Sequence, residues 1–366
     1  MPLIENSVMN RNSMNTGNST RSTKMSHQES QAFKNGRRQF LKGSAALLAG
    51  AAIEPASLVE AAAARSGSLI KRENEKPGAR DWQLTRVRLD KEGFRSTWIE
   101  GYCSRQSLLA GETVDIMVSA SPARKFHLEV FRLGYYGGRG ARLMADLGIL
   151  SARTQPTPQP GDKNLHECRW ETTTQLKIPA DWPSGVYLGR MTTIPESEAE
   201  AYWQSYVVLI VRDERPADIL FQCSDNTWQA YNRWPNNYSV YTHPKGGQGP
   251  WAEVSFDRPY GREAQHEAIV NDPLTVGAGE FLPFEFPLAY WLEEHGYDVS
   301  YCANSDMLAP DRGLKCKAFL SVGHDEYWAG PETAHSPSRP APDRGTTGSP
   351  YDWTLSRRPA SGHPLR

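Results

Sequence analysis

The sequence predicts a β plus α/β fold, in which an immunoglobulin-like β-sandwich precedes a truncated doubly wound α/β domain. Three observations favour this class. Residues 80–213 contain short runs that alternate apolar and polar residues, separated by turns rich in glycine or proline. Residues 214–328 follow a charged, proline-ended linker and combine short apolar strands with a helical pattern. Residues 1–64 and 329–366 carry neither pattern, so we exclude them from both domains.

The sandwich prediction rests on strands with regular turn signals between them. Apolar and polar residues alternate most clearly in Thr113–Ser119 and Phe126–Val130. A glycine-rich run at residues 134–140 follows a strand, as a phosphate-binding loop would, but no clear helix opens after it. A plain connection is therefore favoured there. The strands are expected at Thr113–Ser119, Phe126–Val130, Gly185–Met191 and Tyr202–Val211.

Residues 214–328 predict the N-terminal part of a doubly wound domain of the flavodoxin- or amidotransferase-like type. The expected helix has Pro287 in its first turn and Gly296 at its end, positions that suit those residues. Three strands and one helix leave an apolar face of the sheet uncovered. The domain is therefore expected to be truncated. Its strands are expected at Asp218–Cys223, Asp298–Cys302 and Lys317–Val322, and its helix at Phe286–His295.

Residues 1–64 predict a disordered leader and a twin-arginine signal peptide. Arg37 and Arg38 precede Gln-Phe-Leu-Lys, a pattern that the twin-arginine translocase recognises. The apolar run at 44–53 would rise only about 15 Å as a helix, half of a bilayer core, so it is a signal core rather than a span. Small residues at 61–64 offer a cleavage site. We expect a periplasmic or secreted protein, with the translocase as its partner during export and no stable membrane span.

The tail at 329–366 does not fit the preceding domain. It contains seven prolines and no Val, Ile or Phe, and it is otherwise rich in Ser, Arg, Gly and Thr. Such a segment cannot complete a sheet that is covered on both faces. We expect an aberrant disordered tail, produced by a lost reading frame or a truncated gene near Ala329.

The net charge and the cysteine content limit the classes of partner and of metal site that we expect. The formal net charge of the 366 residues is −1, which argues against nucleic acid or an anionic membrane as the main partner. The five cysteines include no C-x-x-C pair, so a zinc ribbon is not expected. In an oxidising compartment some cysteines could pair, and Cys103 with Cys168, within one predicted domain, is a candidate bridge.

Polar motifs follow the first and third strands of the predicted α/β domain. Ser224–Asn232 follows the first strand and Gly323–Trp328 follows the third. Ligands of doubly wound sheets bind beyond the carboxyl ends of the strands, where the strand order reverses. If the strand order is second, first, third, the two motifs flank that crevice, and we place the candidate site there.

The residues alone leave the role of each side chain open. Glu326 suits a metal ligand or a general base, and it equally suits a solvated loop carboxylate or a structural ion pair. His324 suits a hydrogen-bonded structural histidine as well as a catalytic one. Tyr231 and Tyr260 could supply phenol oxygens, although tyrosines beside tryptophans usually pack in cores. Neither a G-x-S-x-G elbow nor another nucleophile elbow is present, which disfavours serine or cysteine nucleophile chemistry.

At these motifs the sequence resembles the large (beta) subunit of N,N-dimethylformamidase, in its C-terminal domain. The resemblance covers roughly residues 80–328. Segments 98–102 and 131–138 resemble the domain that precedes the C-terminal domain in relatives. The stretches that carry the resemblance are Ser224–Trp234, Val254–Tyr260 and Val322–Trp328.

The resemblance implies a mononuclear iron (Fe3+) held by two tyrosinates and one glutamate. Glu326 matches the glutamate, Tyr231 the first tyrosine, and His324 the nearby histidine, so Glu326 and His324 are the implied catalytic residues. Tyr260 is preferred as the second tyrosine, with Tyr241 in reserve. An iron-activated water would attack a small amide, which makes a small-molecule amide the implied substrate and a small subunit a further partner to consider.

Two alternatives remain. The family residues that complete the pocket follow Glu326, and the tail matches none of them, so the hydrolase could be inactive as a truncated product. The chain could also be a non-catalytic exported module that binds a carbohydrate or an envelope polymer. Its 11 Trp and 15 Tyr favour that second function weakly, since exposed aromatic rings can form binding platforms.

Overall fold

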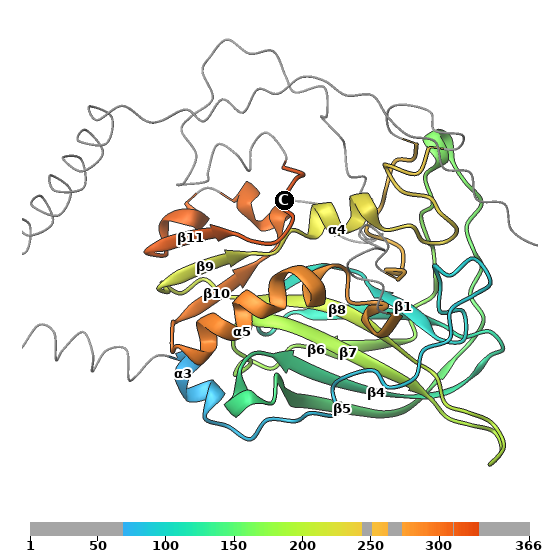
Figure 1. The fold of residues 1–366 in the computed structure, drawn as a ribbon, viewed down its shortest axis with the longest axis horizontal. Coiled ribbons are helices and arrows are strands. Elements are labelled where there is room, and N and C mark those ends of the chain that lie inside the picture. The colour runs from blue at the N-terminus through green and yellow to red at the C-terminus, as the bar shows by residue number, and fades with distance from the viewer. Residues whose placement is uncertain (1–68, 244–250, 263–272, 310, 329–366) are drawn as a thin grey trace, which may run out of the picture. The chain divides into compact units, whose positions relative to one another are not determined.

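The computed structural model describes residues 69–243, 251–262, 273–309 and 311–328, and in this part of the chain the fold is β-rich with few helices (Figure 1). All of them belong to one compact unit, residues 62–366. The predicted signal peptide and tail lie outside the described residues. None of the described helices is long and apolar enough to cross a membrane.

Two sheets of mainly antiparallel strands share one apolar core. Ile116, Leu128 and Leu209, on strands from both sheets, are almost completely buried in a common cluster. All neighbours pair antiparallel except β2 and β8, which pair parallel. The five-stranded sheet has the order β2 (Ser107–Leu109), β8 (Gln204–Arg212), β7 (Gly185–Thr193), β4 (Arg124–Leu133), β5 (Ala141–Ala152), and the three-stranded sheet has the order β1 (Glu100–Cys103), β3 (Thr113–Ser119), β6 (Thr174–Lys177).

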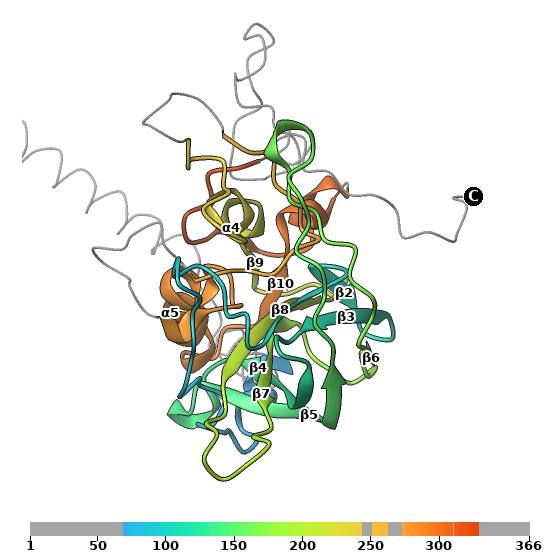
Figure 2. The same ribbon diagram turned by 90° about the vertical axis from the view of Figure 1, so that its right-hand side faces the viewer.

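A third sheet is entirely parallel, in the order β10 (Val299–Cys302), β9 (Ile219–Gln222), β11 (Ala318–Ser321). This is the second, first, third order on which the expected crevice depends. Helix α5 (Phe286–Glu294) lies beside this sheet (Figures 1 and 2), and its Leu292 shares a core with Phe221 of β9. The same core includes Phe131 of β4, so it joins the parallel and antiparallel sheets.

Several elements differ from the sequence expectation, among them one helix and one long strand. Residues 225–231, where no helix was expected, form helix α4 (Asp225–Tyr231), and residues 225–230 are all buried. Most of its buried side chains are polar, so the sequence lacks the apolar stripe with a 3.6-residue period that reveals amphipathic helices. Strand β5 was missed because its side chains are mostly half-exposed or exposed, and its pairing with β4 is irregular. These features weaken the alternation that predicts strands.

The cysteines form no disulfide bond. All five are free, and Cys103 and Cys168 lie in separate apolar clusters. The bridge considered between these two residues is therefore not formed.

A buried ion pair connects the sheets through helix α5. Arg132 of β4 and Glu293 of α5 have fully buried side chains, and Arg132 Nη2 lies 2.7 Å from Glu293 Oε1. Tyr301 of β10 donates its hydroxyl to Glu293 Oε1 at 2.9 Å, and Asn74 of helix α3 (Leu69–Asn74) donates its amide to Glu293 Oε2 at 2.8 Å. Arg132 also donates to the carbonyl oxygen of Ser184. These contacts compensate both charges for the loss of water.

Replacing Glu293 by Leu should lower the free energy of unfolding by about 3–5 kcal/mol, because Arg132 would stay buried without its counter-charge. The double variant Arg132→Met/Glu293→Leu removes both charges and should recover much of that loss. Urea unfolding monitored by tryptophan fluorescence measures both effects. As a control, Arg153→Ala removes an exposed pair with Glu171 and should cost less than about 1 kcal/mol. A single variant as stable as the wild type would contradict this account of the pair.

Candidate functional site

The loop after β11 is fastened to helix α4. The backbone N–H groups of Glu326 and Tyr327 both donate to Thr227 Oγ1, at 3.0 and 3.3 Å. Asn226 Nδ2 donates in turn to the carbonyl oxygen of Tyr327 at 3.1 Å. The two motifs that follow β9 and β11 in the sequence therefore lie in direct contact.

Asp325 anchors this loop to the ends of the strands. Its carboxylate accepts hydrogen bonds from Gln222 Nε2 at 2.7 Å, Ser321 Oγ at 2.6 Å and Asn304 Nδ2 at 3.1 Å. Burial raises the pKa of Asp325, while these donors act in the opposite direction. The carboxylate of Asp325 is therefore bound to residues at the strand ends. The carboxylate of the neighbouring Glu326 instead contacts aromatic side chains.

Phenol oxygens converge on Glu326. Tyr231, at the end of α4, donates its hydroxyl to Glu326 Oε2 at 2.8 Å, and Tyr241 donates to Oε1 at 2.7 Å. The two tyrosine rings stack with centroids 4.3 Å apart. His324 Nε2 lies 3.3 Å from Glu326 Oε2, and the hydroxyl of Tyr327 contacts that of Tyr241. We call Tyr231, Tyr241, His324 and Glu326 the oxygen cluster, after the phenol and carboxylate oxygens that meet there.

The oxygen cluster is partly open to solvent. Tyr241 is 46% exposed, and the side chain of Glu326 is 40% exposed. Partial burial raises the pKa of both Tyr231 and Tyr241, and the Glu326 carboxylate adds to the rise. In the absence of a cation the phenols therefore keep their protons and donate them to Glu326.

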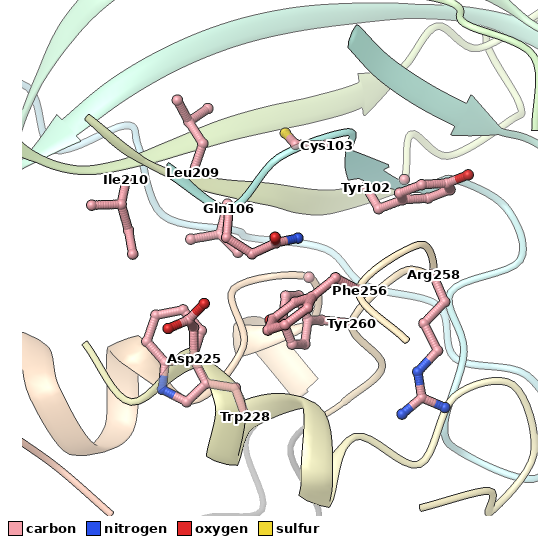
Figure 3. A pocket seen from close by; sticks show the side chains of 13 residues that line it. Tyr102, Cys103, Gln106, Leu209, Ile210, Asp225, Trp228, Phe256, Arg258 and Tyr260 are labelled. Carbon is pink, nitrogen blue, oxygen red and sulfur yellow. The ribbon is translucent and has the colours of Figure 1, made fainter. Parts of the chain in front are cut away.

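Tyr260, the preferred second tyrosine, is not brought to Glu326. Its ring packs edge-on against Trp228, with centroids 6.2 Å apart, and its buried hydroxyl has no hydrogen-bond partner among the described residues. It lines a cavity of about 20 Å³ together with Trp228 and Asp225 (Figure 3). The reserve residue, Tyr241, reaches Glu326 because the backbone N–H of Val240 donates to the carbonyl oxygen of Ala230 at 3.0 Å. This hydrogen bond holds the backbone next to Tyr241 against helix α4.

Arg258 fixes the turn between α4 and Tyr241. Its buried guanidinium donates to backbone carbonyl oxygens at distances of 2.8–3.1 Å, and no carboxylate among the described residues pairs with it. Burial lowers the pKa of Arg258 to about 10. Sequence reasoning missed this role, although an arginine within a motif that otherwise packs in the interior was a usable signal. The carbonyl oxygens belong to Gln229, Asn232, Trp234 and Tyr238.

Glu285 is a second buried residue that sequence reasoning missed. It ends a π-helical turn, Phe281–Glu285, and accepts hydrogen bonds from Ser224 N at 3.1 Å and Trp228 Nε1 at 2.7 Å. A Cβ atom on Gly323, where φ is +72°, would lie 2.7 Å from Glu285 Cγ. Glycine is therefore required at the start of the loop that carries Glu326.

Stability should depend on pH through Glu285. Burial raises its pKa from 4.5 to about 7, so the folded state holds a proton that the unfolded state releases. The stabilisation is complete below pH 4.5 and is lost as the pH rises to 7, an effect on the order of 3 kcal/mol. The variant Glu285→Gln cannot titrate and should show a flatter stability profile between these pH values. Parallel slopes for wild type and variant in urea unfolding would refute this assignment.

Comparisons with known proteins bear on the family. The family described as N,N-dimethylformamidase beta subunit-like, C-terminal, matches residues 127–339. No curated protein matches the chain. Among solved structures, the sporulation control protein Spo0M from Bacillus subtilis is 9% identical with a TM-score of 0.20, and the match covers 32% of this chain and 49% of that one. A family 123 glycoside hydrolase from Clostridium perfringens is 13% identical with a TM-score of 0.15, covering 35% and 28%.

Both structural likenesses are too weak to indicate a common fold, and the chain spans at most about half the length of either protein. The family match is different, because it spans more than half of the 366 residues and includes both motifs of the oxygen cluster. The chain therefore belongs to the N,N-dimethylformamidase beta subunit-like family, through the C-terminal domain of that subunit.

Proposed function

We propose that the protein is an exported, metal-dependent hydrolase that cleaves the C–N bond of an amide, with iron(III) held by Tyr231, Tyr241 and Glu326. Membership of the family supports the amidase class. One observation carries the proposal: two phenol oxygens hydrogen-bond to the two oxygens of a single carboxylate. Such a group presents several hard oxygen donors at one point.

The donor set suits this ion. No group of three or more His, Cys, Asp or Glu side chains that could hold a metal occurs in the described part of the chain, so phenol oxygens would have to complete the ligand set. Phenolate and carboxylate oxygens are hard, anionic ligands of the kind that a highly charged cation prefers. A cation would displace the phenol protons, as metals deprotonate other ligands. Tyr231, Tyr241 and Glu326 would then supply three negative charges.

Bound iron would acidify a water molecule and polarise the amide carbonyl group. The chain's own contribution is positioning and proton transfer. His324 lies 3.3 Å from Glu326 Oε2 and is partly exposed, so its imidazole can reach both the ligand set and a substrate. It would accept a proton from the attacking water and return it to the leaving amine. The products would be an amine and a carboxylic acid.

We also propose that the two antiparallel sheets form an immunoglobulin-like sandwich and that the parallel sheet begins a doubly wound domain. The apolar core shared by both antiparallel sheets supports the first assignment. The parallel β10-β9-β11 order supports the second.

A non-catalytic carbohydrate-binding module is the second candidate. It would need open aromatic faces, and two half-buried aromatic residues, Trp98 and Trp203, do lie side by side. However, the guanidinium groups of Arg88 and Arg124 lie over the Trp98 ring at 4.5 and 4.2 Å. Arg86 lies over the Trp203 ring at 5.4 Å. These rings are engaged by guanidinium groups, which favours the hydrolase.

Export should depend on the twin arginines. Replacing Arg37 and Arg38 by Lys keeps the positive charge of the signal but removes the pair that the translocase recognises. We expect the variant precursor to stay uncleaved in the cytoplasm while the wild type is processed. Cell fractionation with detection of a C-terminal tag measures this. Equal export of both proteins would remove the export proposal and leave the site proposal intact.

Metal content should follow the oxygen cluster. The wild-type protein, loaded with iron(III), should bind about one iron per chain and show a visible phenolate-to-iron absorption band. Glu326→Ala should lose the iron, and Tyr231→Phe and Tyr241→Phe should each weaken binding and the band. Tyr260→Phe is the matched control and should retain both. Elemental analysis and absorption spectra measure these quantities. Loss in Tyr260→Phe with retention in Tyr241→Phe would show that the ligand set is misassigned.

A further inference from the structure

An open cavity lies beside the oxygen cluster. It has a volume of about 540 Å³, and Tyr241 is part of its lining. The hydroxyl of the same tyrosine donates to Glu326. Tyr241 is therefore shared between the cavity lining and the candidate metal centre, whereas Tyr231, His324 and Glu326 do not belong to that lining. Ligand cavities of roughly 300–1,000 Å³ typically hold molecules of drug size, which is far more room than a dimethylated formamide needs.

One wall of the cavity is aromatic and held in place from behind. The ring of Trp251 stacks on that of Tyr238 at an interplanar angle of 24°, and His243 meets Trp251 edge-on at 5.3 Å. Behind Tyr238, the His166 ring lies with its centroid 4.1 Å away. These ring contacts hold Tyr238, His243 and Trp251 in a fixed orientation along the cavity.

Backbone hydrogen bonds fix Trp251 on both sides. Its N–H group donates to the carbonyl oxygen of Val240 at 2.9 Å, and its carbonyl oxygen accepts from Asn164 Nδ2 at 2.9 Å. Because Val240 precedes Tyr241, the aromatic wall and the candidate ligand are held in one register. Rigid rings lose little freedom when a second ring stacks on them, which favours binding.

The non-aromatic residues that line the cavity disfavour the binding of a cation. Asn236, Asn237 and Thr242 offer amide and hydroxyl groups, and Arg233 adds a guanidinium. No carboxylate lines the cavity among the described residues. The chemistry therefore suits a neutral, planar molecule with hydrogen-bonding groups, which an aromatic amide provides.

We infer that the substrate is an aromatic amide, whose ring stacks in this cavity while its C–N bond lies at the oxygen cluster. The inference rests on the proposed hydrolase and narrows its substrate class. In the reaction, the oxygen of water bonds to the carbonyl carbon and the C–N bond breaks. A proton from that water passes to the leaving nitrogen, so an anilide gives a carboxylic acid and an aniline. No oxidant or reductant is needed.

The test compares 4-nitroacetanilide with N,N-dimethylformamide on the full-length mature protein. Binding to the metal-free protein is measured by quenching of tryptophan fluorescence, and hydrolysis by the iron-loaded protein is measured by release of 4-nitroaniline. The anilide should bind at least about tenfold more tightly, which is the gain expected from ring stacking and apolar burial. Equal affinity of the two amides would overturn the inference.

Variants of Trp251 connect the effect to this wall. Trp251→Ala should raise both the dissociation constant and the KM for the anilide about tenfold, with little change for dimethylformamide. Trp251→Phe keeps a ring and should recover most of the affinity, which separates a binding effect from misfolding. Trp291→Ala is the matched control, because Trp291 is 46% exposed on α5 and stacks on His295 outside the cavity. Unchanged anilide affinity in Trp251→Ala would overturn the inference.

Failure of the two proposals can be distinguished. If the wild type binds no iron yet binds the anilide through Trp251, the hydrolase is refuted and the cavity assignment stands as a ligand site. If iron binds and dimethylformamide is hydrolysed without preference for the anilide, the hydrolase stands and the substrate inference is refuted.

Discussion

Parallel pairing of β9 with β11 is the constraint on which the candidate site depends, because it makes both strands end at the same edge of the sheet. Gln222 pairs in register with Ser321, so the chain leaves both strands at the same level. The hydroxyl of Thr227 in α4 then accepts hydrogen bonds from two backbone N–H groups of the loop that carries Glu326. A shift in this register would move Glu326 away from α4, and the tyrosine at the end of the helix could no longer reach it.

The scaffold around the site is built from buried and half-buried polar groups, each with a defined set of partners. Arg258 binds carbonyl oxygens of the turn after α4, and Asp325 binds the ends of the strands. Arg132 and Glu293 play the same part further away, where they connect the sheets through α5. Buried charges contribute little net stability, but their directional bonds penalise alternative loop positions. That is a physical reason to find them beneath loops, which otherwise lack the regular hydrogen bonding of helices and strands.

The sequence was informative where burial is one-sided and periodic. Strand β3 was predicted with its observed bounds, because Val114, Ile116 and Val118 alternate along it and pack in one apolar cluster, whereas Met117 packs in another. Helix α4 was not predicted, because its buried residues are mostly polar and carry no apolar periodicity. The preference for Tyr260 over Tyr241 as the second tyrosine rested on the family resemblance and not on a pattern in the residues. Tyr260 and Tyr241 are both aromatic residues in irregular segments, and only the turn fixed by Arg258 places one of them beside Glu326. Long-range contacts of this kind leave no periodic signal in one sequence.

In the proposed hydrolase, Tyr241 would connect the chemistry to the choice of substrate. Its hydroxyl belongs to the oxygen cluster, and it also forms part of the wall of the cavity. A displacement of this residue would therefore change the candidate ligand set and the cavity together. Its position is set from two directions, by Val240 bonding to α4 and to Trp251, and by Arg258 holding the preceding turn at Tyr238. Because both constraints act on the backbone next to Tyr241, the same bonds would set the distance between a ring bound in the cavity and the oxygen cluster. Fixed separation of this kind is what a hydrolase needs to hold a scissile bond at its reactive centre.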